Sequence, residues 1–319
     1  MTNKIFTASY PGSMMLMGEH AVLRGHPAIA CAINLKLHCQ LKPRQDNLII
    51  LKSALGVHRT SLDQIEMQAP WQFVLQAIKN RHTRLTSGFE LKIDSEFSST
   101  LGLGSSAAVT AATVSVIHQW LGQPLSPAQC LETAGHVIHQ IQGQASLTDL
   151  AATLYGGIVH FSPTKKIVIP IDLALPLTAI YCGYKKRTHE VIAIVDQARQ
   201  QAPKKYLHID EGIANLVAKS TQALQHKDLK LFGQLMTQQQ AFFHQMNLVT
   251  PEIEMIIDML QQDPQILGAK ISGSGLGDCV IALGEISDQT HQKITQQIKH
   301  SECINLIVSP NNRHAMRHD

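Results

Sequence analysis

The first part of the chain carries short apolar or alternating runs, a pattern typical of β-strands. Between two of these runs, residues 61–82 place apolar side chains at helical spacing, and Pro70 should divide this stretch into two shorter helices. The chain is therefore expected to begin as a sheet with a helical insertion. The predicted strands cover residues 4–9, 28–42, 47–52 and 88–94.

The pattern that follows alternates helical periods with short strands. Two helices are predicted at 105–121 and 126–141, and the Pro-containing stretch 163–176 is the expected seam between two domains, 1–172 and 173–319. This order of elements indicates the α+β class. The other predicted strands are 156–162, 166–171, 177–182, the two runs within 268–283, and 303–308; the other predicted helices are 188–201, 210–226, 228–245, 251–262 and 288–299.

Composition narrows the kinds of partner. Of the 319 residues 44% are hydrophobic, enough for a sizeable core, and the formal charge of +3 comes with no basic block and no acidic tail. This argues against nucleic acid or a membrane surface as the main partner and leaves a small molecule. The six cysteines are scattered and no apolar segment reaches the length of a membrane span, so we expect a reduced, cytoplasmic protein.

The stretch GLGSS, residues 102–106, directly precedes the apolar helix expected from residue 105. Such a loop can aim several backbone N–H groups at one point, where the positive end of the helix dipole also lies, and anions bind at such places. The hydroxyl of Ser106 could ligate a Mg²⁺ ion that bridges phosphates. A tight turn with a serine N-cap is the simpler alternative, and no lysine follows as in a Walker A loop.

Two further glycine-rich segments change this picture. PGSMMLMGEHAVLRGHPAIACAI, residues 11–33, comes before the GLGSS loop, and KISGSGLGDC, residues 270–279, comes after it. In this order and over nearly the whole chain, the three segments resemble the GHMP kinase superfamily of small-molecule kinases, and among its members most of all the mevalonate kinases. The resemblance implies a GHMP kinase fold, with an N-terminal domain like ribosomal protein S5 domain 2 and a ferredoxin-like C-terminal domain.

The resemblance also implies an activity and its cofactors. The chain would use ATP and Mg²⁺ to phosphorylate the hydroxyl of mevalonate, and a homodimer is common among relatives. Asp149, in SLTDLAATLYGG, matches the catalytic aspartate, although a helix N-cap is the alternative for this residue. The implied nucleotide-binding residues are Leu101, Gly102, Leu103, Gly104, Ser105, Ser106 and Ala107; the implied substrate-binding residues are Glu19, His20, Ser146, Thr188, Gly273, Ser274 and Gly275. For Glu19 and His20, a buried ion pair at a turn is the alternative.

Two positions depart from the family pattern. Ser13 stands where mevalonate kinases usually have a lysine, and Ile138 stands where a glutamate usually binds Mg²⁺, with Glu132 the nearest acid on that helix. Another cation, Lys185 or Lys186, could compensate, or the substrate could differ. A phosphomevalonate kinase or another mevalonate-type enzyme is therefore the second hypothesis, and a non-catalytic nucleotide- or metabolite-binding relative is the third.

Overall fold

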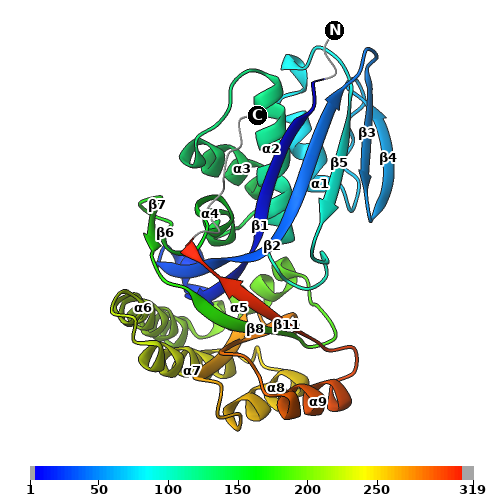
Figure 1. Ribbon diagram of the computed structural model, residues 1–319. Helices are drawn as coiled ribbons and strands as arrows, with labels where there is room; N and C mark the ends of the chain where they lie inside the picture. Colours follow the sequence, from blue (N-terminus) through cyan, green and yellow to red (C-terminus); the bar gives the residue numbers. More distant parts are fainter. Residues whose placement is uncertain (1–3, 311–319) are drawn as a thin grey trace.

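The computed structural model describes residues 4–310 of the chain, and its strands form two sheets, one above the other in Figure 1. The upper sheet has seven strands in the order β4-β3-β5-β2-β6-β7, with β1 paired to β2. The long β2 pairs with β5 along its second half and with β6 along its first. The strands are β1 Phe6–Met17, β2 Ala28–Pro43, β3 Leu48–Ser53, β4 Gly56–Ser61, β5 Phe89–Ser95, β6 Ile158–Ser162 and β7 Ile167–Ile171.

The helices of this half contact one another and the sheet, chiefly along β1 and β2. α2 is buried along most of its length, and the small side chains of its first turns, such as Ala108 and Ala111, let neighbouring elements approach closely. The helices are α1 Gln72–Lys79, α2 Ser105–Trp120, α3 Pro127–Gln142 and α4 Thr148–Tyr155, with short 3₁₀ turns at Ala21–Arg24 and His82–Arg84.

The lower sheet has four strands, all antiparallel, in the order β11-β8-β10-β9. Numbered along the chain within this half, that order is 4-1-3-2, with helices after the first and third strands, which is the ferredoxin-like arrangement. The strands are β8 Leu175–Tyr181, β9 Gly268–Ser272, β10 Cys279–Leu283 and β11 Glu302–Val308; the helices are α5 Thr188–Gln201, α6 Pro203–Gln225, α7 Leu229–Gln245, α8 Pro251–Gln261 and α9 Asp288–Gln297.

The predicted α+β class is confirmed, but β4 and α4 were not predicted, and two other elements differ in extent from the sequence prediction. β1 continues through Pro11 to Met17, because β1 pairs on one side only and an edge strand tolerates proline. The helix predicted over 61–82 is reduced to α1, because residues 62–71 form turns and irregular chain around Pro70, which the prediction expected to break the helix. Residue 171 ends the upper sheet and residue 175 begins the lower one; positions 311–319 of the predicted second domain lie outside the described residues.

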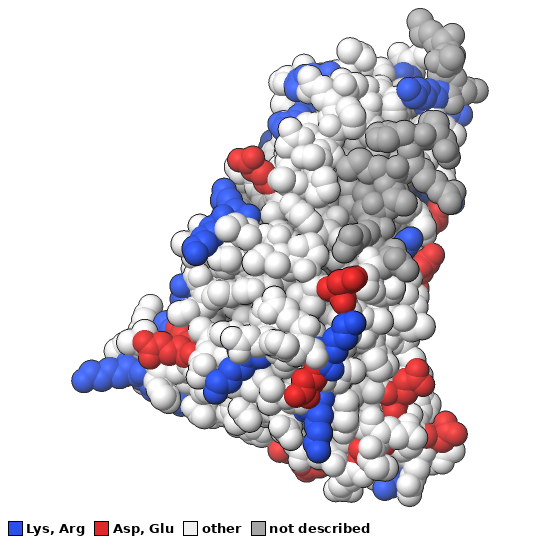
Figure 2. Space-filling view, turned by 60° about the vertical axis from the view of Figure 1, so that its left-hand side comes forward, with Lys and Arg blue, Asp and Glu red and all other residues white. Residues whose placement is uncertain are grey.

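Charge is spread thinly over the surface. Figure 2 shows acidic and basic side chains interspersed on one face, with wide uncharged areas between them. None of the helices within residues 4–310 is both long and apolar enough to cross a bilayer.

Candidate active site

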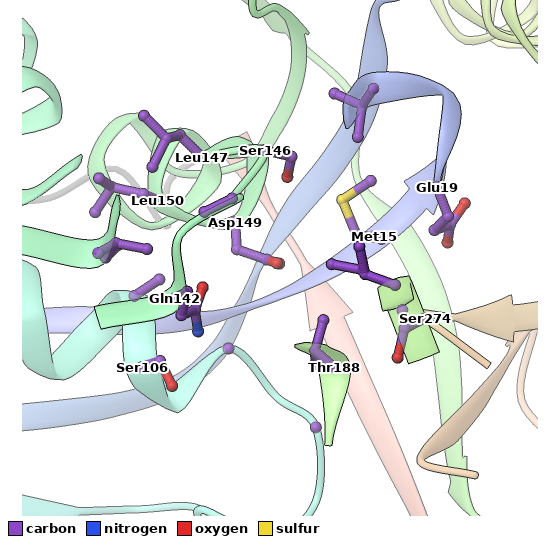
Figure 3. A pocket seen from close by; sticks show the side chains of 18 of the residues that line it. Met15, Glu19, Ser106, Gln142, Ser146, Leu147, Asp149, Leu150, Thr188 and Ser274 are labelled. Carbon is purple, nitrogen blue, oxygen red and sulfur yellow. The ribbon is translucent and has the colours of Figure 1, made fainter. Parts of the chain in front are cut away.

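A cavity of about 210 Å³ is lined by residues from both halves of the molecule. Its wall combines β1, the loop before α2, the loop between α3 and α4, the start of α5 and the turn between β9 and β10. Figure 3 shows Ser106, Asp149, Thr188 and Glu19 around it. Most of the predicted site residues line this cavity: Glu19, His20, Gly102, Gly104, Ser105, Ser106, Ala107, Ser146, Asp149, Thr188, Gly273 and Ser274.

Three of the predicted residues are not among those that line the cavity. Leu101 and Leu103 belong to the hydrophobic core, and their carbonyl groups tie the loop to its neighbours. The Leu101 carbonyl accepts a hydrogen bond from Cys279 Sγ at 2.9 Å, and the Leu103 carbonyl accepts one from the Ser13 amide at 3.0 Å. Gly275 packs closely against Leu248 and Phe243. These three residues therefore hold the backbone of their loops in position and do not line the cavity.

The loop before α2 presents the start of a sixteen-residue helix. Gly104, with a φ of 71°, occupies the N-cap position, and no side chain of the described residues caps the helix, so the serine cap considered as an alternative is absent. The first amides of a helix have no acceptor within it. Since the first turn also lacks acidic residues, its amides and the helix dipole favour an anion at Ser105 and Ser106.

Asp149 lies in the first turn of α4 without capping it, since Leu147 holds the N-cap position. Asp149 Oδ1 instead accepts a hydrogen bond from Ser13 Oγ at 3.0 Å. Ser13 is fully buried and follows an irregular step in the pairing of β1 with β2. Gly104 permits this approach, because a Cβ there would collide with Ser13 Oγ. Strand, glycine loop and carboxylate therefore meet at one point.

Burial raises the pKa of Asp149 above the ordinary range for an aspartate, and the negative charges of Glu19 and Asp278 act in the same direction. The Ser13 hydrogen bond and the positive charge of Lys185 oppose this rise in the pKa. A raised pKa makes the ionised carboxylate a stronger base than a free aspartate. The site therefore contains a carboxylate suited to accept a proton.

Lys185 is the cation that faces the cavity; Lys186 is not among the lining residues. Lys185 Nζ lies 3.2 Å from Asp278 Oδ2, and both residues line the wall beside the glycine loop. Asp278 is not among the site residues expected from the sequence. A signal was present, because an aspartate interrupts a glycine-rich turn, and it adopts a left-handed φ of 74° that favours glycine.

Glu19 is held in a buried ionic cluster. Lys270 Nζ donates a hydrogen bond to Glu19 Oε1, and Gln239 Nε2 donates one to Glu19 Oε2 at 2.5 Å. Lys270 is fully buried and Glu19 is 3% exposed. The ion pair considered as an alternative for Glu19 is therefore present, although Glu19 also lines the cavity. Sequence reasoning missed both partners, since more than 200 residues separate them from Glu19.

His20 and Ser274 join the two halves beside this cluster. His20 Nε2 lies 2.9 Å from the Ser274 carbonyl oxygen, and burial lowers the pKa of His20, which favours the neutral imidazole. Thr188 lies at the start of α5, and the Ser146 hydroxyl accepts a hydrogen bond from the Thr148 amide at 3.3 Å. This part of the wall is thus polar but carries little net charge.

The residues present fit a magnesium ion that is shared with a nucleotide. The described residues contain no cluster of three or more His, Cys, Asp or Glu side chains that could hold a metal. Ile138 lines the cavity as an apolar side chain, whereas Glu132 lines a different cavity. Near the glycine loop, however, Asp278 has a buried Oδ1 without a hydrogen-bond partner. Mg²⁺ is commonly bound by one or two carboxylates together with substrate phosphates.

Comparison with known proteins places this arrangement in a family. The model of the GHMP kinases N terminal domain matches residues 71–157, and the model of the GHMP kinases C terminal region matches residues 220–300. The chain belongs to the GHMP kinase family and is a small-molecule kinase.

Its relatives point to one branch of that family. The mevalonate kinase of Methanocaldococcus jannaschii is 28% identical over 90% of this chain and 94% of its own, and that of Archaeoglobus fulgidus is 30% identical over 86% and 91%. A crystal structure of the Methanococcus jannaschii mevalonate kinase superposes with a TM-score of 0.77 at 25% identity, covering 97% of this chain and 98% of that one. The GHMP kinase fold expected from the sequence is confirmed.

Proposed function

We propose that this kinase transfers the γ-phosphoryl group of ATP to the hydroxyl of mevalonate, giving phosphomevalonate and ADP. One observation carries the proposal: the Asp149 carboxylate and the amides that open α2 line the same cavity. A phosphate bound at the helix can therefore meet an alcohol beside the carboxylate. The relatives named mevalonate kinase support this choice of acceptor.

Each reacting group has a place in this scheme. The triphosphate binds to the backbone at 102–107, where amides and the helix dipole balance its charge. The hydroxyl oxygen attacks the γ-phosphorus and the bond to the bridging oxygen breaks, so that its electron pair leaves with ADP. Asp149 accepts the hydroxyl proton, Ser13 fixes the carboxylate, and Lys185 offsets negative charge. A bound Mg²⁺, held by Ser106 and a neighbouring carboxylate, would neutralise phosphate charge.

The acceptor would occupy the polar wall formed by His20, Ser146, Thr188 and Ser274. Of the described residues that line the cavity, Lys185 is the one lysine or arginine, and it is already paired with Asp278. Phosphomevalonate would bring a second anionic group, which calls for further cationic partners. The charge of the wall thus favours mevalonate, with its single carboxylate, over a phosphorylated acceptor.

Acceptor specificity tests this proposal directly. ADP formation should be followed by a coupled assay with mevalonate, phosphomevalonate, homoserine and galactose in turn, and the product mass should be measured. We expect turnover with mevalonate and a mass gain of one phosphoryl group. Turnover with phosphomevalonate alone would show that phosphomevalonate is the acceptor in place of mevalonate. ATP binding without turnover of any of the four compounds would refute the proposed function.

A further inference from the structure

We propose that Asp278 is the carboxylate ligand of the divalent cation that accompanies the nucleotide, together with the hydroxyl of Ser106, which lines the same cavity. This inference rests on the proposed binding of ATP at residues 102–107. It assigns to the β9–β10 turn a ligand that the resemblance places on the helix α3, where this chain has Ile138.

The position of Asp278 is the first observation. The residue is 8% exposed, and its carboxylate lies against the glycine loop, since a Cβ added to Gly102 would collide with Asp278 Oδ1. That oxygen is buried without a hydrogen-bond partner, and Oδ2 contacts the ammonium of Lys185 at 3.2 Å. A buried carboxylate with one partner is incompletely satisfied, which costs free energy unless a ligand completes it.

Charge is the second observation. A triphosphate on the loop would face a carboxylate of the same sign at short range, and the two would repel each other. Lys185 carries a single positive charge and is partly exposed, so it offsets this repulsion incompletely. A bound divalent cation would offset this repulsion and would give the carboxylate the partner that it lacks.

The strained backbone of Asp278 supports this role. Its φ of 74° lies in the left-handed region, where glycine is favoured, so the aspartate is held there at an energetic cost. The remaining alternative is that Asp278 only positions Lys185.

The two roles predict different effects of a Lys185 substitution on metal affinity. If Asp278 binds the cation, then Lys185→Met removes a competitor for the carboxylate, and metal affinity should stay the same or increase. If Asp278 only positions Lys185, then Asp278→Asn and Lys185→Met should act alike. Asp278→Gly is a second variant, which suits the left-handed backbone and guards against loss of folding.

Mn²⁺ is a suitable probe, because the electron paramagnetic resonance signal of the free ion reports binding without catalysis. Each variant is titrated with Mn²⁺ in the presence of a non-hydrolysable ATP analogue and without acceptor. We expect Asp278→Asn and Asp278→Gly to weaken Mn²⁺ binding at least tenfold, and Lys185→Met to leave it unchanged or tighten it. Glu132→Gln, on α3 and outside the cavity, is the matched control and should bind Mn²⁺ like the wild type.

Mn²⁺ binding by Asp278→Asn and Asp278→Gly at wild-type affinity would overturn the inference, and so would equal weakening in the Lys185 variant. The test stands apart from the proposed function because no acceptor is present. A protein that binds Mn²⁺ and nucleotide through Asp278 but leaves mevalonate unchanged would refute the acceptor and keep this site. If the protein phosphorylates mevalonate and the Asp278 variants keep wild-type metal affinity, the proposed acceptor would stand and this metal site would be refuted.

Discussion

Two acidic regions border the same cavity, and they differ in how completely their carboxylates are paired. In the cluster around Glu19, one oxygen pairs with Lys270 and the other with Gln239, deep in the protein. Elsewhere around the cavity, Asp149 accepts a hydrogen bond from Ser13, and Asp278 pairs one oxygen with Lys185 while the other has no partner.

This difference in pairing distinguishes carboxylates that stabilise the fold from carboxylates that can take part in the reaction. A buried carboxylate with both oxygens hydrogen-bonded fixes the position of chain segments. Removing one partner of such a pair strongly lowers the free energy of unfolding. A carboxylate with spare acceptor capacity beside a cavity can take a proton or a cation. We therefore assign the Glu19 cluster to holding the two halves together and the Asp149–Asp278 wall to the reaction, and four experiments sharpen or break this division.

The largest effect is expected for Asp149→Asn. An amide of the same shape cannot accept the hydroxyl proton, so kcat should fall by roughly 10²–10⁴-fold, the usual contribution of a general base. Nucleotide affinity, measured by calorimetry, should stay within about threefold because the amides of α2 are untouched. Turnover close to that of the wild type would remove Asp149 from the chemistry.

Lys270→Met should act on stability instead. Removing one partner of a buried pair leaves Glu19 uncompensated, and the free energy of unfolding measured in urea should fall by roughly 3–5 kcal/mol. The double variant Glu19→Gln with Lys270→Met should recover part of that loss, because no buried charge remains. A loss below about 1 kcal/mol in the single variant would contradict a structural role for the cluster.

Gly102→Ala tests the close contact between the glycine loop and Asp278. The added methyl group would collide with Asp278 Oδ1 and displace the loop, so nucleotide affinity should fall by about tenfold; the left-handed φ of 68° adds a stability cost of roughly 1–2 kcal/mol. Gly122→Ala is the matched control, with a φ of 69° and open space around it. It should lose stability but keep nucleotide affinity; equal losses of affinity in both variants would contradict the contact.

The smallest effect concerns Ser13→Ala. Its hydrogen bond lowers the pKa of Asp149, so removing it should raise that pKa further. Since Asp149 must be ionised to accept a proton, the acidic limb of the kcat/KM profile should move to higher pH, with rates converging at high pH. Ser9→Ala, on the same strand but paired with His38, should leave the profile in place.

Much of the site could be predicted from the sequence because its chemistry lies in short contiguous segments. The GLGSS loop can be recognised from its glycine and serine residues directly before an apolar helix. Its residues line the cavity. The pairing of Glu19 with Lys270 could not be derived, because it depends on how two distant strands meet. The length of β1 was hidden by Pro11, which suggests a turn until the edge position of the strand is known.

The most direct test of the central claim is a crystal structure with a non-hydrolysable ATP analogue and mevalonate bound together. We expect the phosphates on the amides at 102–107 and the acceptor oxygen within hydrogen-bonding distance of Asp149, roughly 3–3.5 Å from the γ-phosphorus. Phosphates bound elsewhere, or an acceptor hydroxyl beyond the reach of Asp149, would contradict it.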